Sequence, residues 1–239
     1  MVEPVSIDPP FRVPQPVIRQ AWRELTFLHW SFDPAVVRPL IPAGLELDLW
    51  EGKCYVGLVP FILEDITAVR GPALPWLSRF NETNVRTYVL DRHGRRGVWF
   101  FSLDAARLAA VIGARISYGL PYYWAKMSVQ RDGAQVRYRS RRRHGPPGET
   151  HIVVTPGEAI PDPSPLEIFL TARWRLFAYR NRQLFRADID HPRWPLQRVA
   201  VNELEESLIT AAGLPAPRGA PLAHFSAGIK VMTGWPERI

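Results

Sequence analysis

The sequence predicts an α+β fold that is predominantly antiparallel β. Three observations lead to this prediction. The chain has 239 residues, of which 46% are hydrophobic and 11% aromatic, which suffices for a sizeable core. Runs rich in Val, Ile, Phe, Tyr and Trp recur along it, and turn signals separate them at Glu51-Gly52-Lys53, Asp91-Arg92-His93-Gly94 and Arg131-Asp132-Gly133. Strands joined by such turns are typical of antiparallel hairpins.

Residues 1–16 contain five prolines and little periodicity, which predicts an extended N-terminal arm before a single domain over residues 17–239. Within this domain we expect strands near residues 18–30, 45–50, 54–63, 82–90, 97–103, 114–129, 134–143, 150–155, 184–190 and 226–232.

Helices are fewer and have recognisable ends. Ser164, Pro165 and Glu167 form an N-cap, a first-turn proline and a capping-box partner, so we expect the longest helix over residues 165–179. Shorter helices are predicted over residues 33–40, 104–112 with Gly113 as the C-terminal glycine, and 203–212 before Gly213.

The charge balance is basic, with 30 Lys and Arg against 23 Asp and Glu and a net charge of +7. Such a balance permits contact with anions, nucleic acids or acidic membranes and selects none of them. The basic run over residues 137–144 lacks aromatic residues interleaved on its exposed face, so we expect no specific nucleic-acid partner.

The N-terminus lacks the basic start and apolar run of a secretory signal, and no stretch approaches the ~20 apolar residues of a membrane span. We therefore expect a cytoplasmic protein without a membrane partner. Cys54 is the only cysteine, and the six histidines show no compact ligand spacing, so no disulfide and no metal site is predicted. No phosphate-binding loop or nucleophile elbow occurs, and no cofactor is expected. The sequence leaves homo-oligomerisation open.

Six blocks of sequence stand out, at residues 23–34, 40–46, 55–61, 78–88, 100–104 and 191–196. They resemble the YqjF-like family, a branch of the acetoacetate decarboxylase-like superfamily. The resemblance implies a closed or cone-like barrel around an interior cavity. In the decarboxylases a G-x-P segment precedes paired lysines, one of which forms a Schiff base. Here Tyr122 and Tyr123 follow Gly119-Leu120-Pro121, and a phenol cannot form an imine, so we expect no Schiff-base chemistry.

The strand near residues 82–90 alternates between a polar and an apolar face. Glu82, Asn84 and Arg86 share one face, and Val85 and Val89 share the other. In one interpretation the polar face meets water. In the other, which the resemblance implies because Phe80-Asn81-Glu82 matches an aromatic-x-Glu segment of the superfamily, Glu82 points into the cavity. Glu82 would then act as a general acid or base, with Asn84 and Arg86 binding a polar ligand and Arg86 in reach of Glu82.

Three further residues are candidates for the site. Tyr122 occupies the matched slot of the lost nucleophile, and is either a core tyrosine or a hydrogen-bonding group at the base of the pocket. Arg142 would bind a carboxylate or phosphate at the rim if its face of the strand turns inward. His29 lies in a family block, as does His191, and each is either a ligand-binding or a structural histidine.

The partner expected from these residues is a small, anionic or keto-type organic molecule. Two functions stay open: an enzyme acting on a small carboxylated or keto-type substrate without Schiff-base chemistry, and a non-catalytic ligand-binding or sensing module. A nucleic-acid-binding protein is the third and weakest hypothesis.

Overall fold

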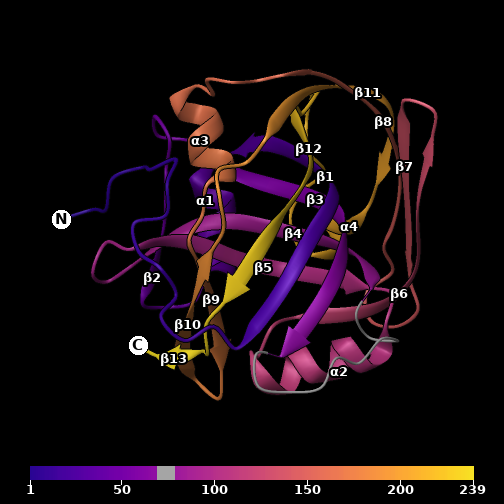
Figure 1. The fold of residues 1–239 in the computed structure, drawn as a ribbon. Helices are drawn as coiled ribbons and strands as arrows, with labels where there is room; N and C mark the ends of the chain where they lie inside the picture. Colours follow the sequence, from indigo (N-terminus) through magenta and orange to yellow (C-terminus); the bar gives the residue numbers. More distant parts are fainter. Residues whose placement is uncertain (69–78) are drawn as a thin grey trace.

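The computed structural model describes residues 1–68 and 79–239, and its main feature is one large sheet that curls on itself (Figure 1). Ser78, the first residue of one family block, lies outside the described residues. The strands in the described part are β1 (Ile18–Phe32), β2 (Leu45–Leu47), β3 (Cys54–Ala68), β4 (Phe80–Asp91), β5 (Arg96–Ala105), β6 (Tyr122–Asp132), β7 (Gln135–Arg142), β8 (Glu149–Ala159), β9 (Arg175–Arg180), β10 (Gln183–Asp190), β11 (Leu196–Glu206), β12 (Leu222–Thr233) and β13 (Glu237–Arg238).

The sheet closes twice, because β4 pairs with β5 and β10 pairs with β12 in addition to the linear strand order. Two rings result, and they share β12, β1, β3, β4 and β5. The first ring is completed by β6, β7, β8 and β11, and the second by β9 and β10. This arrangement is close to the barrel or cone expected. The predominantly antiparallel prediction is confirmed, although β5 pairs in parallel with both β6 and β9.

The shared strands are covered on both faces. A hydrophobic core that includes Val56, Val85, Val136 and Ile152 packs on the side of the first ring. On β4, Glu82, Asn84 and Arg86 point to the opposite side, into the second ring. Neither face of β4 is therefore solvated, and its side chains are buried almost throughout.

A β-bulge in β1 reverses which residues face each side. The pairing of β1 with β3 shifts between Arg23 and Leu28, and Glu24 has a φ of 47°. Trp22 and Leu25 consequently line the second ring, whereas Leu28 packs in the core of the first. An extra residue in one strand has this effect because side chains alternate with period two.

The helices are short and lie outside the sheet (Figure 1): α1 (Pro34–Val37), α2 (Leu108–Ser117), α3 (Pro165–Thr171) and α4 (Leu208–Ala211). The capping box predicted at the start of α3 is present, with Ser164 and Glu167 bonded reciprocally. In the described chain, no helix is long and apolar enough to cross a membrane.

Four predicted elements are wrong in extent. The helix expected over 165–179 ends at Thr171, because the residues from Arg175 pair as β9 with β5 and β10. The helix expected over 104–112 lies at 108–117, and the left-handed glycine behind it is Gly119, with a φ of 69°, rather than Gly113. The strand predicted from residue 114 therefore begins at Tyr122. The first four residues of the helix expected over 203–212 belong to β11, which pairs with β8, and the helix is limited to α4.

The segment before β1 contains no helix or strand. Its Glu3 carboxylate accepts a hydrogen bond from Arg175 Nη1 at 2.6 Å, and the Glu3 carbonyl accepts one from Arg96 Nε at 2.6 Å. These contacts hold the start of the chain against β5 and β9.

Candidate active site

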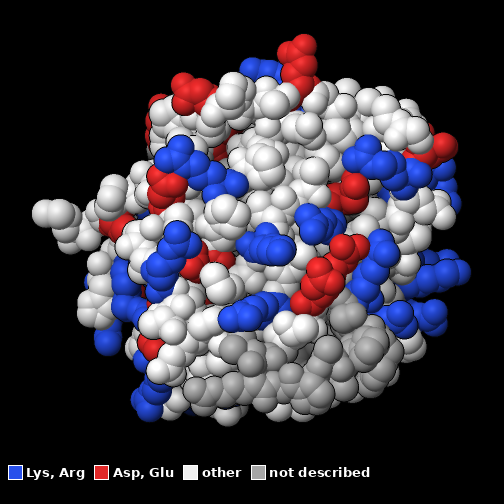
Figure 2. Space-filling model, viewed as in Figure 1, with Lys and Arg blue, Asp and Glu red and all other residues white. Residues whose placement is uncertain are grey.

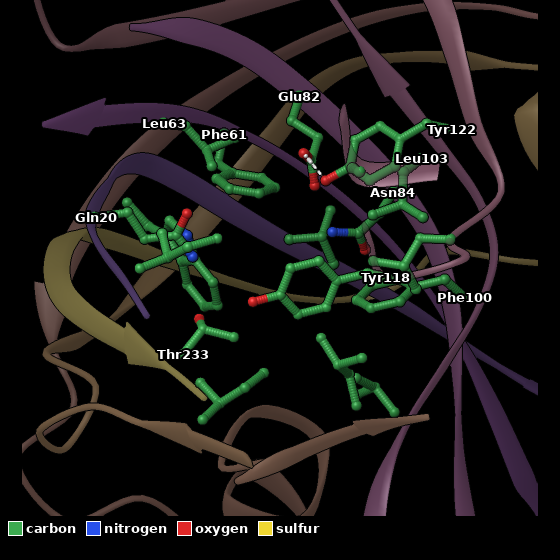
Figure 3. A pocket seen from close by; sticks show the side chains of 18 of the residues that line it. Gln20, Phe61, Leu63, Glu82, Asn84, Phe100, Leu103, Tyr118, Tyr122 and Thr233 are labelled. Atoms are coloured by element: carbon green, nitrogen blue, oxygen red, sulfur yellow. Dashed lines mark hydrogen bonds between the residues drawn. The ribbon is translucent and has the colours of Figure 1, made fainter. Parts of the chain in front are cut away.

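A cavity of about 350 Å³ occupies the interior of the second ring. It is lined by β1, β3, β4, β5, β9 and β10, by the first residue of β6 and the last of β12, by the C-terminal end of α3 and by α2. Figure 3 shows Glu82 and Tyr122 at one wall, with Phe61, Leu63, Phe100, Leu103 and Tyr118 around the same space. Most of the lining is apolar, so the few polar side chains that face the cavity determine its chemistry.

Glu82 is the acid of this cavity. Glu82 is only 3% exposed. The Tyr122 hydroxyl donates a hydrogen bond to Glu82 Oε2 at 2.7 Å (Figure 3). Burial raises the pKa of Glu82 to about 7, although hydrogen bonds from Tyr122 and Asn84 oppose the rise. Burial, and then the charge of Glu82, raise the pKa of Tyr122 well above its usual value. A carboxyl with a pKa near neutrality can both donate and accept a proton.

Arg86 is a buried arginine of the cavity lining. It is 8% exposed, and its Nε and Nη2 find no acceptor among the described residues. Its guanidinium carbon lies 5.3 Å from the ring centroid of Phe27 and 5.8 Å from that of Tyr88. The contact expected between Arg86 and Glu82 is not formed, since the acid bonds to Tyr122 and Asn84 instead. Four residues of strand separate the two by about 13 Å.

Arg173 is a second arginine of the lining, and it was not predicted from the sequence. It sits just before β9, where a helix was expected. Its Nη1 donates to Asp48 Oδ2 at 2.6 Å and its Nε to the Phe169 carbonyl at 2.9 Å, while Nη2 has no described acceptor. It stacks on Tyr88 at 4.4 Å. The alternation of Arg and apolar residues over 173–177 was the signal that could have identified a strand here.

Aromatic side chains form one wall of the cavity. Trp22 and Trp194 stack with ring centroids 6.0 Å apart, and Phe61 meets Trp22 edge-on at 5.6 Å. His191 joins them, 5.1 Å from Trp194, and burial lowers the pKa of His191 to about 4. At neutral pH this imidazole is therefore uncharged, and it contributes no cation to the cavity.

Of the residues predicted from sequence, the structure brings Glu82, Asn84, Arg86 and Tyr122 together around the cavity. His29 and Arg142 do not line it. His29 is fully buried and meets the Tyr88 hydroxyl at 2.6 Å. Because that hydroxyl donates to the Leu170 carbonyl, His29 Nε2 carries the proton of their bond.

Arg142 turns to the other side of the sheet. Its Nε bonds both oxygens of Asp104, at 2.9 and 3.0 Å, and its guanidinium stacks on Tyr123 at 4.1 Å. Both side chains of this pair are almost completely buried. Arg142 therefore does not lie at the rim of the cavity, where it was predicted, and instead forms a structural ion pair with Asp104.

No lysine contributes to the described lining of the cavity. Lys126, the nearest in sequence to the matched slots, is exposed on β6 and lines a separate surface depression. Tyr122 faces the cavity, whereas Tyr123 packs against Arg142 on the other side. Among the described residues, no three His, Cys, Asp or Glu side chains cluster as metal ligands would.

A family model described as an uncharacterized conserved protein, DUF2071, matches residues 19–230 of the chain. The chain belongs to this family. The uncharacterized protein YqjF of Bacillus subtilis is 34% identical over 224 residues, which cover 93% of this chain and 92% of that protein. The resemblance to the YqjF-like family is thereby confirmed.

Solved structures with the same fold are acetoacetate decarboxylase-like. An enzyme of this kind from Sphingomonas wittichii superposes with a TM-score of 0.66 at 16% identity, covering 96% of both chains. The acetoacetate decarboxylase of Legionella pneumophila gives 0.64 at 16% identity, covering 96% of this chain and 90% of its own. The enduracididine biosynthesis enzyme MppR, complexed with pyruvate, gives 0.67 at 13% identity, covering 94% and 91%. These similarities confirm the fold.

Proposed function

We propose that the cavity binds a small organic molecule through a carboxylate, and that Glu82 exchanges a proton with the bound molecule. The observation that carries the proposal is the Arg86 guanidinium, which is buried in the lining with two N–H donors that have no described acceptor. A buried cation is costly unless an anion pairs with it. A ligand carboxylate is the group that fits, because it accepts two parallel hydrogen bonds from a guanidinium.

Glu82 and Tyr122 supply the reactive end of the site. Their hydrogen bond of 2.7 Å fixes the carboxyl, and a pKa of about 7 lets it change protonation state near neutral pH. As a carboxylate, such a group can remove a proton from the carbon next to a ligand carbonyl. As a carboxylic acid, it can return a proton to that carbon. The reaction class supported is therefore proton transfer on a carboxylated or keto-type substrate. The lack of a lysine in the described lining argues against an imine intermediate.

MppR, which has the same fold, is complexed with pyruvate in one solved structure, and pyruvate is a small keto acid of the proposed class. The second candidate function is a non-catalytic binding module, which the phenol at the matched nucleophile position favours. Turnover separates the two. If the ligand is recovered unchanged by NMR after long incubation with the protein, the module is correct.

The binding test uses isothermal titration calorimetry with pyruvate and 3-phenylpropionate on the wild type, Arg86→Gln and Arg139→Gln. Arg139 is an exposed arginine of β7 remote from the cavity. Loss of a charge-assisted hydrogen-bonding pair costs about 1.5–3 kcal/mol, so Arg86→Gln should weaken carboxylate binding roughly 10- to 100-fold. Arg139→Gln should bind as the wild type does. Equal affinity in all three proteins, or no carboxylate binding to the wild type, would refute the proposal.

A further inference from the structure

We infer that the molecule bound here is a carboxylic acid with a bulky, ring-bearing apolar body, larger than pyruvate or acetoacetate. This inference rests on the proposed function, because it describes the body of the ligand whose carboxylate pairs with Arg86. It assigns a substrate class to the site, and it follows from the size of the cavity, the chemistry of its walls and the position of its mouth.

The cavity is too large for a small keto acid. Its volume of about 350 Å³ is that of roughly twelve liquid waters at ≈ 30 Å³ each, and pockets of 300–1,000 Å³ typically take drug-sized ligands. Pyruvate has about six non-hydrogen atoms and would leave about half of such a volume to water. The lining also runs from Thr171 and Arg173, at the end of α3, to Gly113 on α2, and these two helices lie at opposite ends of the molecule in Figure 1.

The walls between these ends are apolar. Strands β3, β5, β9 and β10 of the second ring build them, through Val59, Phe61, Leu63, Val98, Phe100, Leu103, Leu176 and Ile189. Water held against such walls is displaced favourably by an apolar group. A ligand with only polar groups would gain nothing from this part of the cavity, whereas an apolar body would bury most of its surface there.

One wall is suited to a ring. Trp22 and Trp194 are stacked, with an interplanar angle of 20°, and both line the cavity. Aromatic rings prefer offset-stacked or edge-on contact with other rings. The indole Nε1 of Trp22 is buried and has no described acceptor, so this wall also offers one hydrogen-bond donor to an oxygen carried by the body of the ligand.

Positive charge is confined to one part of the described lining. Arg86 and Arg173 both stack against Tyr88, at 5.8 and 4.4 Å. Asp48 bonds Arg173 but is shared with Arg96, so the positive charge here exceeds the negative. A ligand carboxylate belongs at this end. Its body then extends along the apolar walls past Glu82 towards α2.

The cavity reaches the surface at α2, and we call this opening its mouth. Ala109, Ala110, Gly113 and Ala114 line the cavity, and Ala109 and Gly113 are also exposed. A Cβ added at Gly113 would meet no atom within 4 Å. Gly113→Leu therefore places a larger side chain at the mouth, with open space for its Cβ, and it raises helix propensity. The control is Ile112→Leu, at an exposed position of the same helix.

The test is a calorimetric titration of the whole protein at pH 7.5 with three probes: 3-phenylpropionate, pyruvate and the uncharged 3-phenylpropan-1-ol. Burial of a phenyl group is worth about 1.5–3 kcal/mol, so 3-phenylpropionate should bind roughly 10- to 100-fold more tightly than pyruvate. It should also bind more tightly than the alcohol. Gly113→Leu should weaken 3-phenylpropionate more than pyruvate, and Ile112→Leu should change neither.

The outcomes separate this inference from the proposed function. If pyruvate binds as tightly as 3-phenylpropionate and both depend on Arg86, the inference is wrong and the proposed function stands. If the alcohol equals the acid in affinity, the cavity recognises no carboxylate and both are wrong. If no probe binds, or if Gly113→Leu affects both acids equally, the assignment of a bulky apolar body is overturned.

Discussion

Replacement of Glu82 by Gln should stabilise the protein at alkaline pH and have little effect at acidic pH. The buried carboxyl has a pKa of about 7 in the folded chain, against an ordinary value of 4.5. The unfolded chain therefore releases this proton at lower pH than the folded chain does. Stability is lost as pH rises from about 4.5 to about 7, and the loss is constant above that window. The difference between the two pKa values lowers the free energy of unfolding by about 3 kcal/mol, because each pKa unit is worth 1.36 kcal/mol.

Glutamine removes this penalty and keeps the hydrogen bonds. Its carbonyl can accept from Tyr122, and its amide can donate to Asn84 Oδ1, which has no described partner, once the Asn84 amide turns over. Urea denaturation at pH 4.5 and pH 8 should show a variant that is more stable than the wild type by about 3 kcal/mol at pH 8 and nearly equal at pH 4.5. Glu158→Gln, at an exposed position, should show no such dependence. A Glu82→Gln variant that is equally destabilised at both pH values would refute the reasoning.

Three further predictions concern lysine chemistry, the surface and the buried ion pair. Acetoacetate with borohydride should leave no stoichiometric adduct on Lys53, Lys126 or Lys230, and a single reduced imine mapped by peptide mass spectrometry would contradict this. Figure 2 shows Lys and Arg interspersed with Asp and Glu on the viewed face. Binding to DNA should therefore be weak, and it should be lost between about 50 and 200 mM salt. Sequence-dependent, sub-micromolar binding at physiological salt would contradict this prediction. Asp104→Asn should destabilise the protein by about 3 kcal/mol in urea, because it leaves Arg142 buried without its anion, and a change below about 0.5 kcal/mol would mean that the pair contributes little.

The sequence predicted the strands with strong period-two patterns and failed where tertiary pairing decided the structure. The segment from Arg175 to Arg180 has good helix formers and continues a well-capped helix, yet pairing with β5 and β10 makes it a strand. Likewise, Glu203–Glu206 has helical residue types but pairs with β8. The helix propensity of these residues does not outweigh the strand pairing, because propensities span a smaller range of free energy than burial contributes.

The candidate site was predictable in the same uneven way. Glu82, Asn84 and Arg86 lie on one strand, so period two alone places them together, and the resemblance to a known family indicated the inward face. Arg173 was missed because its segment was assigned to a helix. The turning away of Arg142 depends on Asp104, a residue 38 positions earlier in the chain, and such a distant partnership leaves no trace in the local pattern.

The two faces of β4 have different roles, and this separation determines which substitutions the strand can accept. Val85 belongs to the core of one ring while its neighbours Asn84 and Arg86 line the cavity of the other. Alternate positions of a single strand can therefore be exchanged as independent sets, one constrained by packing and the other by the ligand. Substitutions at Asn84 or Arg86 can thus change the chemistry of the cavity while Val85 and the core around it stay as they are.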